Sequence, residues 1–389
     1  MTRHFSIPTA LRMTPMPLLR NFFVRVGHEM RNSVWEQFSN RNVRPILEAI
    51  QQLEPAQRNS VEAALHDIFD LACEAGVRAI HEAAVSAELT GFAFSSPEPG
   101  SPYGISVWTW LYYPTVFERA MLLFEVDHLS RWRKRTDVPR MTPCTSPRVV
   151  LQLGEAIGEL LRREEGRGQQ CTVEHVRRKD ATDYFLAYPD DFLDTILAHD
   201  EEGALTPQSV RPTFEIVFAY SQADGTLELN AKIPSRLKPE LEDIFCQIVL
   251  GQPAENCGPE AVYDLNVLKD GPQRLDTDPE DRVTPVVRRL RLAIPESRAT
   301  ITLEADRSAG PQSIYRMLDE YLNRERLPLS DLDVTSATIG LMLHPTNCRK
   351  AGRLTFDVSR PDTCTLRSHR PDQVALAQKY LKRWGIAVV

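Results

Sequence analysis

The spacing of apolar residues changes once along this chain, near residue 170, and this change limits the fold class more than any other feature. Before it, apolar side chains recur every three or four residues, as along 43–53 and along 61–83, where one long helix is expected. After it, apolar and polar side chains mostly alternate, as along 214–220 and 227–231, which predicts strands. We therefore expect an α+β protein whose helices come first.

Two glycines around Arg167 mark the predicted boundary between two domains, because glycine ends helices and punctuates loops. A mainly helical domain is expected over residues 1–165. Residues 170–389 are expected to form a mixed α+β domain of antiparallel hairpins and helices. A stretch rich in proline, aspartate and glycine interrupts this second domain, so two subdomains, 170–255 and 280–389, are an open alternative.

The chain is acidic overall, with 46 basic and 53 acidic residues and a net charge of −7. This balance excludes a protein-wide basic field for coating nucleic acid. The charge is uneven, however, since residues 1–50 sum to +4, residues 151–250 to −9 and the last 39 residues to +4. Arginine outnumbers lysine 38 to 8, which either GC-rich codon usage or selection for bidentate contacts with phosphate and carboxylate explains.

Cysteine usage and the N-terminus predict a cytoplasmic protein of bacterial type. Seven cysteines are scattered without a CxxC pair, which favours reduced thiols over a secreted disulfide framework. The N-terminus lacks the apolar core of a secretory signal. The most apolar stretch, 107–124, contains Pro114, Glu118 and Arg119, so neither a transmembrane segment nor a membrane partner is expected.

The sequence contains no local catalytic or cofactor motif. It lacks the GxxxxGK[ST] loop that cradles phosphates, a GxGxxG turn after a strand, the HExxH zinc helix and the GxSxG nucleophile elbow. An active site assembled from distant residues stays open. No catalytic residue, metal ligand or cofactor is therefore predicted, and a non-enzymatic role is favoured.

The strongest candidate binding segment is the basic run Arg131, Trp132, Arg133, Lys134 and Arg135. It begins a proline-containing stretch, 131–147, that we expect to be an exposed connector. Four positive charges around an indole could hold phosphates and stack a base of single-stranded nucleic acid, or could bind an acidic protein. The favoured interpretation is structural: the basic last turn of a helix, with Trp132 buried.

A second basic feature lies on a strand predicted in the last third of the chain. Arg289 and Arg291 share one face of this strand, opposite Leu290 and Leu292. With the basic run they could form a surface for nucleic acid or for a partner protein. Basic residues also crowd the end of the last predicted helix, where solvated cations suit the helix dipole.

One short segment concentrates carboxylates: Asp190, Asp191, Asp194, Asp200, Glu201 and Glu202, with His199 among them. If residues 191–198 form a helix, Asp191 and Asp194 share a face on which oxygen ligands could hold Mg²⁺. A metal-dependent nuclease would also need a carboxylate and a lysine on a strand, and the usual E-x-K triplet is absent. Helix capping and solubility are the favoured interpretation.

A possible zinc set has the right residue types, since His344, Cys348, Cys364 and His369 supply two thiols and two imidazoles. Its spacing argues against zinc. Residues 334–343 and 353–358 are predicted to form a hairpin, and its returning strand would place Cys364 about 20 Å from the first pair unless the chain doubles back at 360–362. We therefore favour the interpretation that these are buried or half-buried cysteines that bind no metal.

Together these observations favour a non-enzymatic cytoplasmic subunit that binds other proteins in a larger bacterial assembly, for example a multi-gene system for stress or phage defence. Several ordered domains, uneven charge and the lack of a catalytic motif motivate this hypothesis. The first alternative is a protein that binds or processes DNA or RNA through 131–135. The second is a metal-dependent hydrolase with dispersed carboxylates.

Overall fold

A computed structural model describes residues 4–89, 101–200, 203–254, 262–295, 297, 299–306, 308, 310–346 and 350–388. The chain forms two compact units, Met1–His128 with Val176–Asp180, and Leu129–His175 with Ala181–Val389. The predicted α+β fold with a helical N-terminal part is confirmed. The predicted boundary at Arg167 lies inside the second unit.

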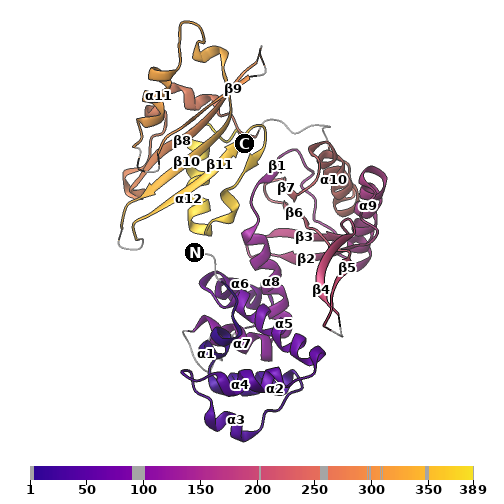
Figure 1. The fold of residues 1–389 in the computed structure, drawn as a ribbon. Helices are drawn as coiled ribbons and strands as arrows, with labels where there is room; N and C mark the ends of the chain where they lie inside the picture. The colour runs from indigo at the N-terminus through magenta and orange to yellow at the C-terminus, as the bar shows by residue number, and fades with distance from the viewer. Residues whose placement is uncertain are drawn as a thin grey trace. The chain divides into compact units, whose positions relative to one another are not determined.

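The first unit is helical (Figure 1). Most of its helices carry proline at the first or second position, where the missing N–H and fixed φ cost little. The helices are α1 (Ile7–Met13), α2 (Met16–Arg25), α3 (Asn32–Gln37), α4 (Arg44–Gln51), α5 (Pro55–Leu71), α6 (Glu74–Ser86), α7 (Pro102–Tyr112) and α8 (Pro114–His128).

The long helix expected across 61–83 is divided into α5 and α6. Ala72 and Cys73 leave the helical conformation, with ψ values of 51° and 170°. The Cys73 Sγ then caps α6 by accepting a hydrogen bond from the Gly76 amide at 3.3 Å. A Cβ at residue 76 would lie 2.2 Å from the Leu71 carbonyl oxygen, so this close turn requires glycine. The apolar stripe runs on across the break and therefore does not reveal it.

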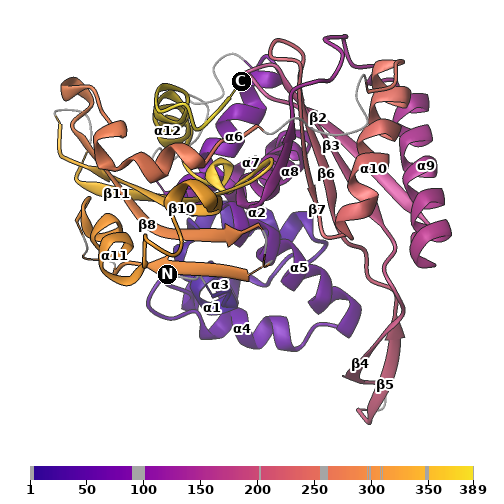
Figure 2. The same cartoon turned by 90° about the horizontal axis from the view of Figure 1, so that it is seen from above.

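The second unit is built on an antiparallel sheet of ten strands within the described residues, in the order β2-β3-β6-β7-β1-β12-β11-β10-β8-β9 (Figures 1 and 2). A separate hairpin pairs β4 (Asp194–His199) with β5 (Leu205–Val210). The strands of the large sheet are β1 (Trp132–Arg135), β2 (Cys171–Arg177), β3 (Thr182–Pro189), β6 (Ile216–Ser221), β7 (Thr226–Ala231), β8 (Val283–Ile294), β9 (Ala299–Glu304), β10 (Asp333–Leu343), β11 (Gly352–Ser359) and β12 (Thr363–Cys364).

Each half of the sheet has its own helices and its own hydrophobic core. Helices α9 (Pro147–Glu165) and α10 (Lys238–Phe245) pack on β3, β6 and β7, and α10 continues into a π-helical turn. Helices α11 (Ser313–Tyr321) and α12 (Pro371–Arg383) pack with β8, β10 and β11.

Helix α9 explains why the units divide earlier than the sequence predicted. Its apolar residues Leu153, Ile157 and Leu161 are fully buried in the core of the first half-sheet. At Gly154 a Cβ would lie 2.6 Å from the Cys171 carbonyl oxygen, so this glycine lets α9 approach strand β2 closely. The helix therefore belongs to the sheet, although its periodicity resembles that of the helices before it.

Strand β1 joins the two halves. It pairs with β7 on one side, placing Arg133 opposite Leu229, and with β12 on the other, placing Trp132 opposite Cys364. The expectation of an exposed connector over 131–147 is therefore wrong at its start, because Trp132–Arg135 form a central strand of the sheet. Residues 136–146 contain no helix or strand, and α9 begins at Pro147.

Two arginines of β1 are held by buried carboxylates. The Arg133 Nε lies 3.2 Å from a Glu242 oxygen and 3.0 Å from an Asp362 oxygen. Arg135 pairs with the other Glu242 oxygen at 3.3 Å and with Asp137 at 2.6 Å. The Glu242 side chain on α10 is 1% exposed, and this burial raises its pKa while the two arginines act to lower it. The network therefore links α10, β1 and the segment before β12.

We expect Glu242→Gln to destabilise the protein by about 3 kcal/mol, because it leaves two guanidiniums inside the sheet without the carboxylate between them. Urea unfolding at pH 7 measures this change. The matched control is Glu240→Gln on the same helix, whose side chain is 45% exposed and pairs with Arg163; it is expected to change stability by less than about 0.5 kcal/mol. Equal effects of the two variants would contradict the role of Glu242.

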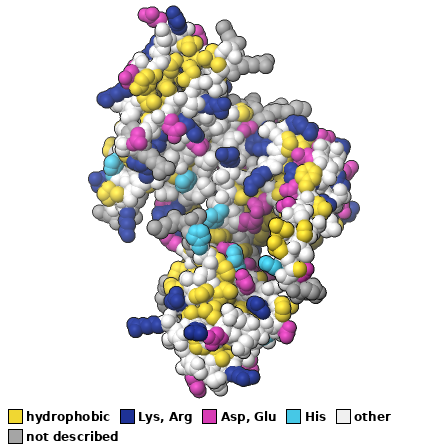
Figure 3. All heavy atoms as spheres, in the orientation of Figure 1, with side chains coloured by type: hydrophobic (Ala, Val, Ile, Leu, Met, Phe, Trp, Pro, Cys, Tyr) yellow, Lys and Arg dark blue, Asp and Glu magenta, His cyan; other side chains and the backbone are white. Residues whose placement is uncertain are grey.

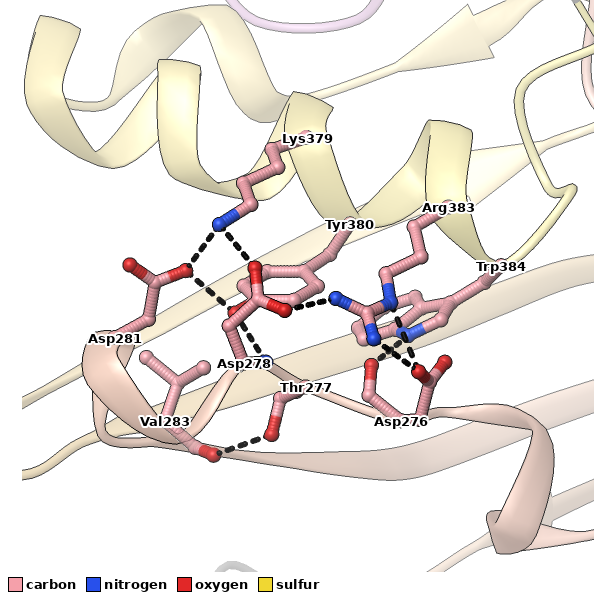
Figure 4. A network of polar contacts seen from close by, with 9 residues as sticks. All are labelled: Asp276, Thr277, Asp278, Asp281, Val283, Lys379, Tyr380, Arg383 and Trp384. Carbon is pink, nitrogen blue, oxygen red and sulfur yellow. Dashed lines mark hydrogen bonds and ion pairs between the residues drawn. The ribbon is translucent and has the colours of Figure 1, made fainter.

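A second polar network clamps helix α12 to the loop before β8 (Figure 4). Lys379 lies 2.5 Å from Asp278 and 2.8 Å from Asp281. Arg383 forms ion pairs with Asp276 and Asp278. Rings of α12 join the network, since the Trp384 indole donates to the Asp276 carbonyl oxygen and the Tyr380 hydroxyl donates to Asp281. Two of the basic residues expected to be merely solvated at this helix end are therefore paired.

This clamp gives the protein an acid-sensitive contact. The hydrogen bonds from Lys379 lower the pKa of Asp278 and of Asp281. A carboxyl group whose pKa is lower in the folded than in the unfolded state stabilises the fold above its unfolded pKa, and this stabilisation is lost as the pH falls through the folded pKa. The clamp is therefore complete at neutral pH and opens in acid.

We expect the double variant Asp278→Asn/Asp281→Asn to lose less stability than the wild type when the pH is lowered from about 5 to about 2. Urea midpoints at several pH values measure the difference. Glu320→Gln, which removes an exposed carboxylate of α11, is the control and should follow the wild type. Parallel curves for the double variant and the wild type would show that these carboxylates do not couple to folding.

Candidate protein-binding site

The basic run of β1 is mostly interior. Trp132 and Arg135 are each 2% exposed, and Arg133 and Lys134 are half-buried, so that only Arg131 is exposed. Arg133 and Arg135 form ion pairs with Glu242 and with neighbouring carboxylates inside the sheet. Nucleic-acid binding by this segment stays a prediction, and it would have little surface to act through.

The second predicted basic feature lies far from the first in the sheet. Strand β8 is separated from β1 by three strands, a centre-to-centre distance of about 19 Å. Arg289 donates to Asp357 at 3.1 Å, and Arg291 is exposed. The structure therefore does not bring the two basic features together.

The acidic segment forms hairpin β4–β5, and the helix considered for 191–198 is absent. Its carboxylates accept local hydrogen bonds: Asp194 from the next amide at 2.8 Å and Asp200 from the Ala204 amide at 2.7 Å. Glu201 and Glu202 lie outside the described residues. Within the described part of the chain, no three carboxylate, cysteine or histidine side chains gather as metal ligands.

The three described residues of the possible zinc set, His344, Cys364 and His369, lie on separate segments. Cys348 lies outside the described residues. Burial raises the pKa of the Cys364 thiol to about 12, which disfavours the thiolate that zinc binds. His344 shares a hydrogen bond of 2.8 Å with the Thr284 hydroxyl, and His369 is half-buried on another segment.

Hairpin β4–β5 is the feature that the sequence did not identify as a binding site. We call it the arm, and define it as residues 190–211. Figure 2 shows its two strands reaching away from the other strands of the second unit. The register pairs Leu197 with Pro207 and His199 with Leu205, and Gly203, at φ 80°, completes the turn.

The arm carries large apolar side chains in water. Six of the fourteen exposed large hydrophobic residues among the described ones lie here: Phe192, Leu193, Ile196, Leu197, Leu205 and Val210. Leu197 is 69% exposed, the highest value in that set. Because side chains alternate along a strand, Ile196 and Val210 occupy one face and Leu197 and Leu205 the other. Both faces of the ribbon are therefore apolar and uncovered.

The base of the arm is firmly attached to the sheet. Arg167 donates to Asp191 and to Glu165, both at 2.8 Å, and its guanidinium lies 4.0 Å from the centre of the Phe214 ring. Although partial burial opposes it, hydrogen bonding from Arg167 lowers the pKa of Asp191. The predicted domain boundary at Arg167 is thus the anchor of the arm.

The arm is also strongly acidic. Residues 190–211 contain six carboxylates and one arginine, a net charge of −5. Phosphate backbones and anionic lipid surfaces would both repel such a charge. The arm therefore combines apolar contact area with a charge that suits a basic protein surface.

Among the described residues, no helix is both long enough and apolar enough to cross a bilayer. Comparison of the chain with protein-family models and with curated proteins finds no match.

Proposed function

We propose that this chain is a non-enzymatic binding subunit that docks onto a partner protein through the arm. The observation that supports it is the uncovered apolar surface on both faces of an anchored hairpin. Exposed apolar patches of this kind mark interaction sites, because a partner that covers the apolar side chains removes the free-energy cost of their exposure to water.

The size of the apolar surface suits a docking element. Covering a half-exposed leucine or isoleucine stabilises a complex by about 1 kcal/mol, so the six side chains of the arm supply several kcal/mol. A lone two-stranded hairpin is also marginally stable in water. A partner that covers the arm would therefore order it and gain affinity in the same step.

The setting of this function is part of the proposal. Unpaired cysteines without a CxxC motif suit the reducing cytoplasm, and the arginine-rich composition suits a bacterial genome of high GC content. We place the chain in a multi-protein bacterial assembly. DNA or RNA binding is less favoured, because most of the basic run 131–135 is buried or half-buried and lies apart from Arg289 and Arg291 in the sheet. Metal-dependent hydrolysis is less favoured, because the carboxylates among the described residues do not gather as metal ligands.

The test is a quantitative pull-down of the tagged full chain from its native cells, with and without nuclease. We expect stoichiometric partner proteins that persist after nuclease. Ile196→Ser/Leu197→Ser should reduce their recovery at least tenfold, because removing about 1.4 kcal/mol of apolar contact weakens binding by that factor. Mass spectrometry measures recovery.

The matched control is Leu151→Ser on α9, another leucine that is 62% exposed. It should retain every partner. Full recovery of the same partners by the arm variant would contradict the proposal. Partners that disappear with nuclease alone would instead support the nucleic-acid alternative.

A further inference from the structure

The first unit presents a basic and apolar surface on helix α2. Arg20, Asn21, Val24 and Arg25 are all exposed, and their spacing places them on one face of the helix. We call this surface the α2 ridge, together with exposed Tyr112 of α7. Figure 3 shows Lys and Arg side chains standing among hydrophobic ones on the displayed face of this unit.

Aromatic side chains hold the two arginines in place. The Arg20 guanidinium lies 5.2 Å from the ring centre of Trp35, and that of Arg25 lies 5.4 Å from the ring centre of Trp110. Arg25 also donates to the Leu111 carbonyl oxygen at 2.9 Å. Arginines ordered in this way lose less side-chain entropy when they bind a carboxylate.

The charge of the ridge is not neutralised locally. Within the described residues neither Arg20 nor Arg25 forms an ion pair, whereas arginines of the second unit such as Arg135, Arg167 and Arg383 do. Between the two ridge arginines, Val24 is 58% exposed, and Tyr112 beside them is 50% exposed. Arginine and tyrosine around an exposed aliphatic side chain are the residue types that dominate protein–protein contacts.

We propose that the α2 ridge receives the arm of a second copy of this chain, so that the protein assembles with itself. The arm supplies carboxylates and apolar side chains, and the ridge supplies guanidiniums and an apolar centre. In the contact, Ile196 of one copy, which lies on the same face of the arm as Asp194, packs on Val24 and Tyr112 of the other. Asp194 of the arm faces Arg25. This inference rests on the proposed function, because it takes the arm to be a docking element.

The occupant is chosen by complementarity of charge and polarity. Two arms could not cover each other well, because their combined charge of about −10 would oppose pairing. A nucleic acid is disfavoured at the ridge, since Trp35 is 5% exposed and the Trp110 ring lies under Arg25. Stacking of bases needs open ring faces. The acidic arm satisfies both the charge and the apolar centre of the ridge.

Each chain has one arm and one ridge. Two copies can therefore close reciprocally into a dimer with two equal contacts, or the contacts can continue into a chain of copies. Self-association should weaken at high salt, because the guanidinium–carboxylate pairs at the surface are screened.

The experiment is sedimentation velocity of the full chain over a range of concentrations. The wild type is expected to self-associate. Arg25→Glu and Asp194→Arg should each weaken association at least tenfold, and Ile196→Ser should do the same without changing charge. Leu151→Ser is the control and should associate like the wild type. Circular dichroism of each variant verifies that the fold is kept.

Mixing the two charge-reversed variants is the decisive part of the experiment. An Arg25→Glu chain keeps the acidic arm and has a carboxylate at position 25 of the ridge, and an Asp194→Arg chain has a guanidinium at position 194 of the arm and keeps the basic ridge. Each variant alone is expected to be monomeric. Mixed at equal concentration, they should form heterodimers, because the reversed arm meets the reversed ridge and the unchanged arm meets the unchanged ridge.

A wild type that stays monomeric, or variants that do not complement on mixing, would overturn the inference. If the arm variants nevertheless lose their partners in the native-cell pull-down, the proposed function stands and only self-assembly fails. If the arm variants keep those partners as well, both fail. Salt-dependent binding of an oligothymidine probe that Arg25→Glu abolishes and Ile196→Ser leaves unchanged would assign the ridge to nucleic acid and overturn the inference.

Discussion

The carboxylate of Glu242 lies almost entirely out of water, and the guanidiniums of Arg133 and Arg135 make its charge tolerable there. An unpaired buried carboxylate costs several kcal/mol, so α10 and β1 are mutually dependent. Asp362 extends the same network to the segment before β12. Because β1 is the strand on which the two half-sheets meet, this cluster of charges adds to hydrophobic packing in holding them together.

Much of the fold could be predicted from local spacing. Helix α4, the hairpin of β6 and β7, the strand β8 that carries Arg289 and Arg291, and the last helix, α12, all lie where the apolar spacing placed them. Their signals are local, because amphipathic helices and hairpins each carry their own pattern of apolar residues and turn residues. The division between α5 and α6 was missed because it depends on one close turn at Gly76, which leaves the apolar stripe intact.

The basic run shows why a local motif can mislead. In sequence its arginines have only each other and Trp132 as neighbours, which is typical of an exposed, charged connector. In the structure Arg135 pairs with Glu242, 107 residues away. The Arg383–Asp276 pair is also separated by 107 residues. A single sequence carries no sign of which distant carboxylate neutralises which arginine, so the burial of these charges could not be predicted.

The arm was misjudged for a different reason. Its apolar residues Phe192, Leu193, Ile196 and Leu197 have the spacing of one helical face, yet they form the start of a ribbon that is apolar on both sides. Strand prediction relies on one buried apolar face and one polar face exposed to water, whereas both faces of the arm are exposed and carry apolar side chains. The available signals were the turn glycine at 203 and the β-branched pair Thr195-Ile196, which favour a hairpin. A hairpin whose apolar side chains are to be covered by a partner need not show the alternation of apolar and polar residues that marks a strand packed on its own core.

The ion pairs and ring contacts of the arginines give a physical reason for the excess of arginine over lysine. At Arg383 and Arg167 one guanidinium reaches two carboxylates, and at Arg167 it also lies over an aromatic ring. Lys379 also reaches two carboxylates, Asp278 and Asp281, but its ammonium has neither the planar fork of a guanidinium nor a flat face that stacks on a ring. Codon usage can supply arginines, but the internal pairs of the second unit use their geometry. The ridge arginines, Arg20 and Arg25, lie over Trp35 and Trp110 and pair with no carboxylate of the described residues, so their guanidiniums can still bind a partner in this way.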